Sequence, residues 1–224
     1  MLVVPVRDLD GALHSLEFIN PAGGKQFLKG GAVEGHGQVL GNLQGARTIL
    51  LCEGYATGVS LHRASGVSVV VCFHAGNLTP VALHVRQHYP HAALMMAADD
   101  DQYTKGNPGK TAAEQAARRV GGSVFLPDFT GLDTRSAPTD FNDVHVLGGL
   151  AHLKAQIQAA LPNTRVPAPA PDRKRLTPAS TQPPESPAQP TTDPKRRIEM
   201  AAFSRRSTER GDERSGRGGR RGGG

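Results

Sequence analysis

Residues 95–111, MMAADDDQYTKGNPGKT, join an apolar run to three successive aspartates and then to a loop of glycine and lysine. The apolar run (93–98) is short and continuous, as is typical of a strand covered on both faces of a parallel sheet. Beyond the loop, alanines and a valine recur at helical spacing over 109–120. The stretch therefore predicts a buried strand, an acidic turn and a helix.

The same order repeats on both sides of this stretch. Further short apolar runs lie at 48–52, 67–73 and 123–127, and segments of helix length lie at 55–65, 78–89 and 146–161. Right-handed crossovers between parallel strands bring the carboxyl ends of all the strands to one edge of the sheet, where open α/β folds bind ligands. We expect an α/β fold whose parallel four-stranded sheet is flanked by helices.

Charge and composition divide the chain into three parts. The whole chain has 26 Lys and Arg and 20 Asp and Glu, and residues 162–224 hold 14 of the basic and 7 of the acidic residues. Residues 1–161 therefore keep 12 basic and 13 acidic residues, a net charge of −1. We predict a small β-rich lobe over 1–45, the α/β domain over 46–161, and a disordered tail over 162–224 that is Pro-rich and then Arg- and Gly-rich. Arg205, Arg206, Arg217, Arg220 and Arg221 in this tail either hold nucleic-acid phosphates or are simply solvated.

The composition also limits the class of protein. No apolar run approaches the ~20 residues that a membrane-spanning helix requires, and the N-terminus lacks the layout of a signal peptide. We expect a protein of the cytoplasm that has no membrane contact. Cys52 and Cys72, the only cysteines, lie within apolar runs and are expected to be reduced core residues.

Acidic residues follow several of the predicted strands. Glu53 ends the first strand of the sheet, Asp99 and Asp101 end the third, and Asp140 and Asp143 follow the fourth. Like charges at ~4 Å repel by about 4 kcal/mol at an effective dielectric constant of 20, so a cluster would need a cation. Oxygen ligands favour Mg²⁺ or Mn²⁺. The alternative is that the aspartates cap a helix, which contributes ~0.3–1 kcal/mol but leaves Glu53 unexplained.

The ordered set CEGYATG (52–58), AADDD (97–101), NPGKTAAEQAA (107–117) and DFNDVH (140–145) resembles the Toprim domain of plasmid- and phage-type DNA primases. Residues 4–31 are similar to the small lobe that precedes Toprim in bacterial-type primases. The resemblance implies a catalytic set of Glu53, Asp99 and Asp101, in which Glu53 is the acid/base or a metal-linked glutamate and the two aspartates are the metal-binding pair. It also implies a further acidic, metal-binding motif in Asp140 and Asp143, and a Lys25 that faces the nucleotide or the nucleic acid. The resemblance also leads us to expect a second basic residue near 35–39, but this segment is GHGQV and has no Lys or Arg.

This resemblance implies a DNA primase core, a nucleotidyltransferase that synthesises short RNA on single-stranded DNA from ribonucleoside triphosphates for a plasmid, phage or other mobile element. A replicative helicase or another replication protein is a candidate partner. A Toprim nuclease or phosphodiesterase shares the acidic set, and a truncated, noncatalytic DNA-binding fragment is a third alternative.

The loop before the helix at 109–120 offers phosphate contacts. Lys105, Gly109 and Lys110 lie at a predicted helix N-terminus, a natural phosphate cradle, although a flexible surface loop would look the same. A P-loop ATPase is disfavoured because GxxxxGK[ST] needs glycine at position 104, which is Thr104.

Overall fold

The structure is a computed structural model that describes residues 1–161. Its elements run in the order β1 Leu2–Arg7, β2 Leu13–Ile19, β3 Lys25–Phe27, β4 Gln38–Leu40, β5 Thr48–Cys52, α1 Tyr55–Ser65, β6 Ser68–Val71, α2 Ala75–His88, β7 Ala93–Ala97, α3 Pro108–Val120, β8 Ser123–Phe125 and α4 Phe141–Ala160. The predictions for the tail, including its five arginines, concern residues outside those that the structure describes.

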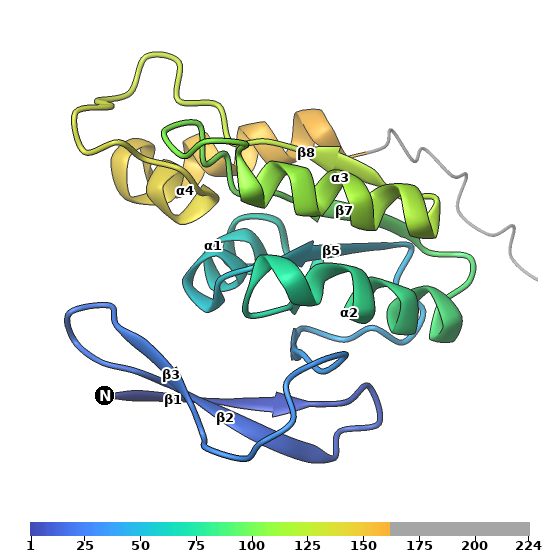
Figure 1. Cartoon of the computed structure of the whole chain (residues 1–224). Helices are drawn as coiled ribbons and strands as arrows, with labels where there is room; N and C mark the ends of the chain where they lie inside the picture. The colour runs from blue at the N-terminus through green and yellow to red at the C-terminus, as the bar shows by residue number, and fades with distance from the viewer. Residues whose placement is uncertain (162–224) are drawn as a thin grey trace, which may run out of the picture. The chain divides into compact units, whose positions relative to one another are not determined.

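The strands form two sheets (Figure 1). β1, β2 and β3 make an antiparallel sheet, and the second sheet has the order β4-β6-β5-β7-β8. In the second sheet β6, β5, β7 and β8 are parallel, which confirms the predicted four-stranded parallel sheet. β4 pairs antiparallel with β6 at the edge and was not predicted. It precedes residue 46 in the chain yet belongs to the central sheet, and the division of the chain at 45 and 46 stays a prediction.

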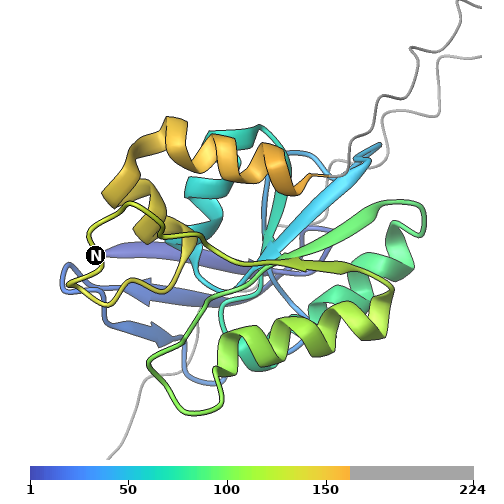
Figure 2. The ribbon, with the colours of Figure 1, turned by 90° about the horizontal axis from the view of Figure 1, so that it is seen from above.

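Helices cover both faces of the five-stranded sheet, α1 and α4 on one face and α2 and α3 on the other (Figure 2). Alternate residues of β5 lie on opposite faces of the sheet. Ile49 and Leu51 pack with α2 and α3, while Leu50 and Cys52 pack with α1 and α4. This is why the strands are continuous apolar runs rather than alternating ones. Cys52 and Cys72 are buried and free, as predicted.

The three-stranded sheet joins the larger unit through buried apolar contacts and through one loop. Val4 and Val6 belong to the same buried cluster as Leu50 and Cys52. Arg7 and Gly37 exchange two backbone hydrogen bonds of 2.8 Å, which tie β1 to the segment just before β4. The small sheet is thereby held against the domain that follows it.

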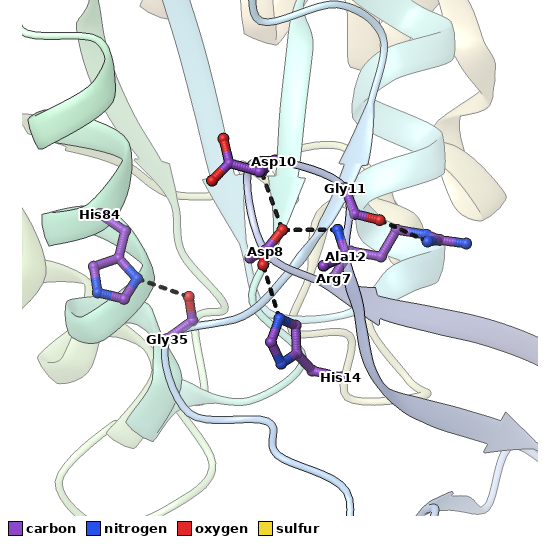
Figure 3. Close-up of polar contacts among 8 residues, drawn as sticks. All are labelled: Arg7, Asp8, Asp10, Gly11, Ala12, His14, Gly35 and His84. Carbon is purple, nitrogen blue, oxygen red and sulfur yellow. Dashed lines mark hydrogen bonds and ion pairs between the residues drawn. The ribbon is translucent and has the colours of Figure 1, made fainter.

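Side chains fix the turns of this junction (Figure 3). The Asp8 carboxylate accepts hydrogen bonds from the backbone of Asp10 at 3.1 Å and of Ala12 at 2.8 Å, and it lies 2.8 Å from His14 Nε2. These contacts close the predicted β1–β2 hairpin turn. On the other side of the junction, His84 of α2 contacts the Gly35 carbonyl oxygen at 3.0 Å.

Two helices begin three or more residues earlier than predicted. α2 begins at Ala75 rather than 78, although it contains Pro80. α4 begins at Phe141 rather than 146, because a capping box formed by Asp140 and Asp143 starts a first segment that a non-helical Gly149 separates from the rest. No helix within residues 1–161 combines the length and the apolar character needed to cross a membrane.

Candidate active site

The carboxyl ends of β5 and β7 carry the central acidic residues. The two strands are parallel neighbours, with Leu51 opposite Met96. Glu53 follows the last residue of β5, and Asp99 lies two residues beyond the end of β7. The fold therefore brings Glu53 and the Asp99–Asp101 segment to the same edge of the sheet. We call Glu53, Asp99 and Asp101 the acidic edge.

Burial leaves two of these carboxylates without full hydrogen bonding. Glu53 Oε1 and Asp99 Oδ1 are buried and have no hydrogen-bond partner. Burial, followed by repulsion from Asp101, raises the pKa of Glu53 to about 7, against the effects of the Ala75 N–H and of Lys25. Burial, followed by repulsion from Glu53, Asp140 and Asp101, raises the pKa of Asp99 to about 8. Such unpartnered buried oxygens are costly unless a cation or a proton meets them.

The two other aspartates of the DDD run differ in their contacts. Asp100 is turned to protein partners: Oδ1 accepts from Asn107 Nδ2 at 2.6 Å, and its N–H donates to the Thr139 carbonyl oxygen at 2.7 Å. Asp101 Oδ2 accepts from the Gly109 N–H at 2.9 Å, at the start of α3. Asp101 thus caps α3 and also lies close enough to Glu53 to raise its pKa. The capping interpretation therefore holds for Asp101, and the metal-binding interpretation of Asp99 and Asp101 stays a prediction.

Gly109 is packed against the acidic edge. A Cβ at this position would lie 2.8 Å from the Asp99 carbonyl oxygen and 3.0 Å from Asp101 Oδ2. Its N–H already binds Asp101, and Asn107 Oδ1 accepts from the Lys110 N–H at 3.4 Å, so two side chains cap this helix N-terminus. A phosphate would have to replace the Asp101 carboxylate there. The phosphate-binding role predicted for Lys105, Gly109 and Lys110 stays a prediction.

Asp140 and Asp143 start α4 and have structural partners. Asp140 accepts from the Asp143 N–H at 2.8 Å and from Thr57 Oγ1 at 2.9 Å. Asp143 Oδ2 accepts from the Thr139 N–H at 2.8 Å and the Asp140 N–H at 3.3 Å. Asp140 lies near enough to Asp99 to raise its pKa, so it borders the acidic edge. Their predicted metal-binding role is untested.

Lys25 reaches this region from β3 of the small sheet. Its Nζ lies 3.7 Å from the position of a Cβ built on Gly54, the residue after Glu53. Its positive charge lowers the pKa of both Glu53 and Asp99. The lysine therefore faces the acidic edge, although β3 and β5 belong to different sheets.

Within the described residues, the acidic edge offers oxygen donors but no preformed metal site. Among residues 1–161, no three His, Cys, Asp or Glu side chains are already arranged to hold a metal ion. The chemistry of the donors nevertheless fits a hard cation, because the two unpartnered buried atoms are both carboxylate oxygens.

Sequence reasoning missed the residues that support this edge. Phe73, between β6 and α2, has a φ of 71°, which is unusual for a bulky residue. The turn it makes leads to Ala75, whose N–H lowers the pKa of Glu53. Asn77 is buried and binds the backbone of Val33, Gly35, His36 and Cys72 at 2.7–3.1 Å. Asn77 follows a glycine and lies three residues before Pro80, so it resembles a loop residue and the sequence gives no signal of this role.

Comparison with known proteins identifies the class of domain. Residues 48–151 match the Toprim domain family and are a Toprim domain. Toprim domains are generally metal-binding, which agrees with the oxygen donors at the acidic edge.

Two relatives are DNA primases, and they confirm the resemblance of this Toprim domain to those of plasmid-type primases. The chain is 37% identical to one DNA primase TraC of Escherichia coli over 133 residues, 56% of this chain and 12% of the relative. It is 32% identical to a second DNA primase TraC of Escherichia coli over 164 residues, 70% of this chain and 11% of the relative. The chain thus spans about a tenth of the length of these curated relatives.

A solved structure shares the fold. The primase fragment of the bacteriophage T7 primase-helicase protein superimposes with a TM-score of 0.50 at 16% identity, over 69% of this chain and 62% of the fragment. This likeness supports the α/β architecture.

Proposed function

We propose that this chain is the catalytic core of a DNA primase, which synthesises short RNA primers on single-stranded DNA from ribonucleoside triphosphates for a plasmid, phage or other mobile element. The observation that carries the proposal is the pair of buried, unpartnered carboxylate oxygens of Glu53 and Asp99 at adjacent strand ends of a Toprim domain. The similarity to DNA primase TraC supports primer synthesis as the activity.

Glu53, Asp99 and Asp101 would hold Mg²⁺ or Mn²⁺, with Asp140 and Asp143 as further acidic candidates. When bound, such an ion binds the triphosphate, lowers the pKa of the attacking 3′-hydroxyl and stabilises the leaving pyrophosphate. The chain's own contribution is to hold these carboxylates at one edge, through the Gly109 N–H on Asp101 and the turn that leads to Ala75.

Glu53 and Lys25 have distinct roles in this proposal. Glu53 either helps to hold the ion or, with its pKa of about 7, accepts or releases a proton near neutral pH as a general acid or base. Lys25 supplies positive charge from the small sheet at the place where the triphosphate would lie. Lys105, Gly109 and Lys110 are candidates for further phosphate contacts.

A Toprim nuclease or phosphodiesterase is the second candidate function, since it would use the same carboxylates. Two observations favour the primase. Lys25 reaches the acidic edge from the small sheet, and the similarity to the second TraC relative covers 70% of the chain, more than the Toprim domain alone. A noncatalytic DNA-binding fragment is the third candidate, and it predicts DNA binding without synthesis.

The test is primer synthesis by the purified full chain with single-stranded DNA, labelled ribonucleotides and Mg²⁺ or Mn²⁺. The proposal predicts short labelled oligomers that E53Q and D99N abolish. Fragmentation of the DNA instead supports the nuclease, and DNA binding with neither product supports the noncatalytic fragment. A variant with the five tail arginines changed to glutamine tests whether the tail contributes salt-dependent DNA binding.

The same proposal implies the substrates, the cellular location and a partner of this chain. Single-stranded DNA and ribonucleoside triphosphates would be the substrates, the cytoplasm the location, and a replicative helicase or another replication protein a partner.

A further inference from the structure

Glu17 shares a face of the small sheet with Lys25. Glu17 of β2 lies opposite Phe27 of β3, and Ile19 lies opposite Lys25. Opposed residues of antiparallel strands point to the same side, so Glu17 and Lys25 are diagonal neighbours, with backbone positions about 7–8 Å apart. This face is turned to the Toprim domain, because Ile19 and Phe27 pack against its buried cluster.

Glu17 is a buried carboxyl group with an incomplete set of partners. Its side chain is only 2% exposed, and Oε2 has no hydrogen-bond partner. Burial raises its pKa, and Lys25 is the charged residue that opposes this rise. A carboxyl group is rarely buried in this way without a cation within reach.

Lys25 interacts electrostatically with this carboxyl group and with the acidic edge. Its Nζ approaches Gly54, and its charge acts on Glu53, on Asp99 and on Glu17. The charges that raise the pKa values of Glu53 and Asp99 are those of Asp101, Asp140 and each other, and Glu17 is not among them. The charge of Lys25, which acts on all three carboxyl groups, thus links Glu17 to the acidic edge.

We propose that Glu17 is a positioning residue for Lys25: it draws the ammonium group toward the small sheet, so that Lys25 does not compete with a divalent cation for the oxygens of Glu53 and Asp99. This inference rests on the proposed function, because it assumes that the acidic edge binds a divalent cation. It adds a buried residue, outside the Toprim domain, to the groups that set the affinity of that site.

The experiment measures Mn²⁺ binding to the full chain at pH 8 by calorimetric titration. The variants are E17Q, K25M and E17Q/K25M, with S15A as a matched control. Ser15 lies two residues before Glu17 on the same strand and is equally buried, with an unpartnered hydroxyl group.

We expect E17Q to weaken Mn²⁺ binding by roughly threefold or more, because Lys25 then competes for the carboxylates. K25M should bind more tightly than the wild type, and adding E17Q to K25M should change the affinity by less than about twofold. S15A should bind like the wild type.

Three results would overturn the inference. An unchanged affinity in E17Q would show that Glu17 does not act on the site. An equal loss in the wild-type and K25M backgrounds, or a loss in S15A, would show a general effect of disturbing the small sheet. A wild-type chain that binds no Mn²⁺ would instead remove the proposed metal site itself, which distinguishes failure of the proposed function from failure of the role of Glu17.

Discussion

Replacing Asp99 by asparagine should stabilise the metal-free protein at high pH. The pKa of Asp99 rises from an ordinary 3.8 to about 8, because the charged form is buried and repelled by its neighbours. Between these values the unfolded chain has lost its proton while the folded chain keeps it, so the wild type loses stability as the pH rises from about 4 to about 8. Asparagine has the same shape and carries no charge, so D99N should not share this loss.

The size of the effect follows from the same pKa. One pKa unit corresponds to about 1.4 kcal/mol, so the rise sets an upper bound of about 6 kcal/mol on the difference in unfolding free energy. Solvent screening and the repulsion shared with Glu53 reduce this, and we expect D99N to be more stable by about 2 kcal/mol at pH 9 and equal to the wild type near pH 4.

The assay is urea unfolding followed by circular dichroism in EDTA across this pH range. D100N is the matched control: it removes the same charge one residue away, where Oδ1 accepts a hydrogen bond from Asn107, and it should bring no gain at pH 9. Mn²⁺ at about 100 times its dissociation constant should stabilise the wild type by about 2.7 kcal/mol and D99N by much less. A D99N protein that is less stable than the wild type at pH 9, or a difference that does not depend on pH, would refute the reasoning.

Three further predictions follow from the support and the charge of the acidic edge. G109A should weaken Mn²⁺ binding by about tenfold in a titration, because the new Cβ would collide with the Asp99 carbonyl oxygen at 2.8 Å. G76A, at the same position of α2, is the control: its Cβ would meet only the movable His74 ring at 3.4 Å, and Mn²⁺ binding should not change. Equal losses of affinity in the two variants would contradict this. N77A should lower the unfolding free energy by about 3 kcal/mol in urea titrations, since it leaves buried backbone groups unpaired, and the prediction fails if the loss is under about 1 kcal/mol. Mn²⁺ affinity should fall as the pH drops from about 8 to 6, because Glu53 and Asp99, with pKa values of about 7 and about 8, must lose their protons to bind; an affinity constant over this range would count against both as ligands.

Periodicity was sufficient to predict the central architecture. Apolar runs buried on both faces indicate the four parallel strands, and the order of strands and helices places Glu53 and Asp99 at one edge of the sheet. This worked because the side-chain period of a strand and the handedness of crossovers are local and general properties.

Features that depend on tertiary contacts were not predictable. β4 is three residues long and is a strand only because β6 offers it an edge to pair with. α2 begins before Leu78 because Asn77, which resembles a loop residue, instead binds the backbone of the loop before β4. The sequence predicts Asp140 and Asp143 as metal ligands, and their spacing also suits the capping box that they form in the structure.

The sequence does not distinguish a carboxylate that caps a helix from one that is free to bind a cation, for a related reason. An acidic residue near a strand end looks the same in sequence whether its oxygens face a helix N-terminus or a cation. Asp101 binds the Gly109 N–H, while Asp99 keeps an unpartnered buried oxygen. Burial and hydrogen bonding distinguish the two, and neither can be read from the run DDD.

The most direct test of the shared cation is a crystal structure of the protein grown with Mn²⁺ at pH 8, with anomalous scattering recorded at the manganese absorption edge. We predict an anomalous peak within coordination distance, about 2.0–2.3 Å, of carboxylate oxygens from both Glu53 and Asp99, and no such peak in D99N crystals. A peak elsewhere on the protein, or none at this edge of the sheet, would contradict the account.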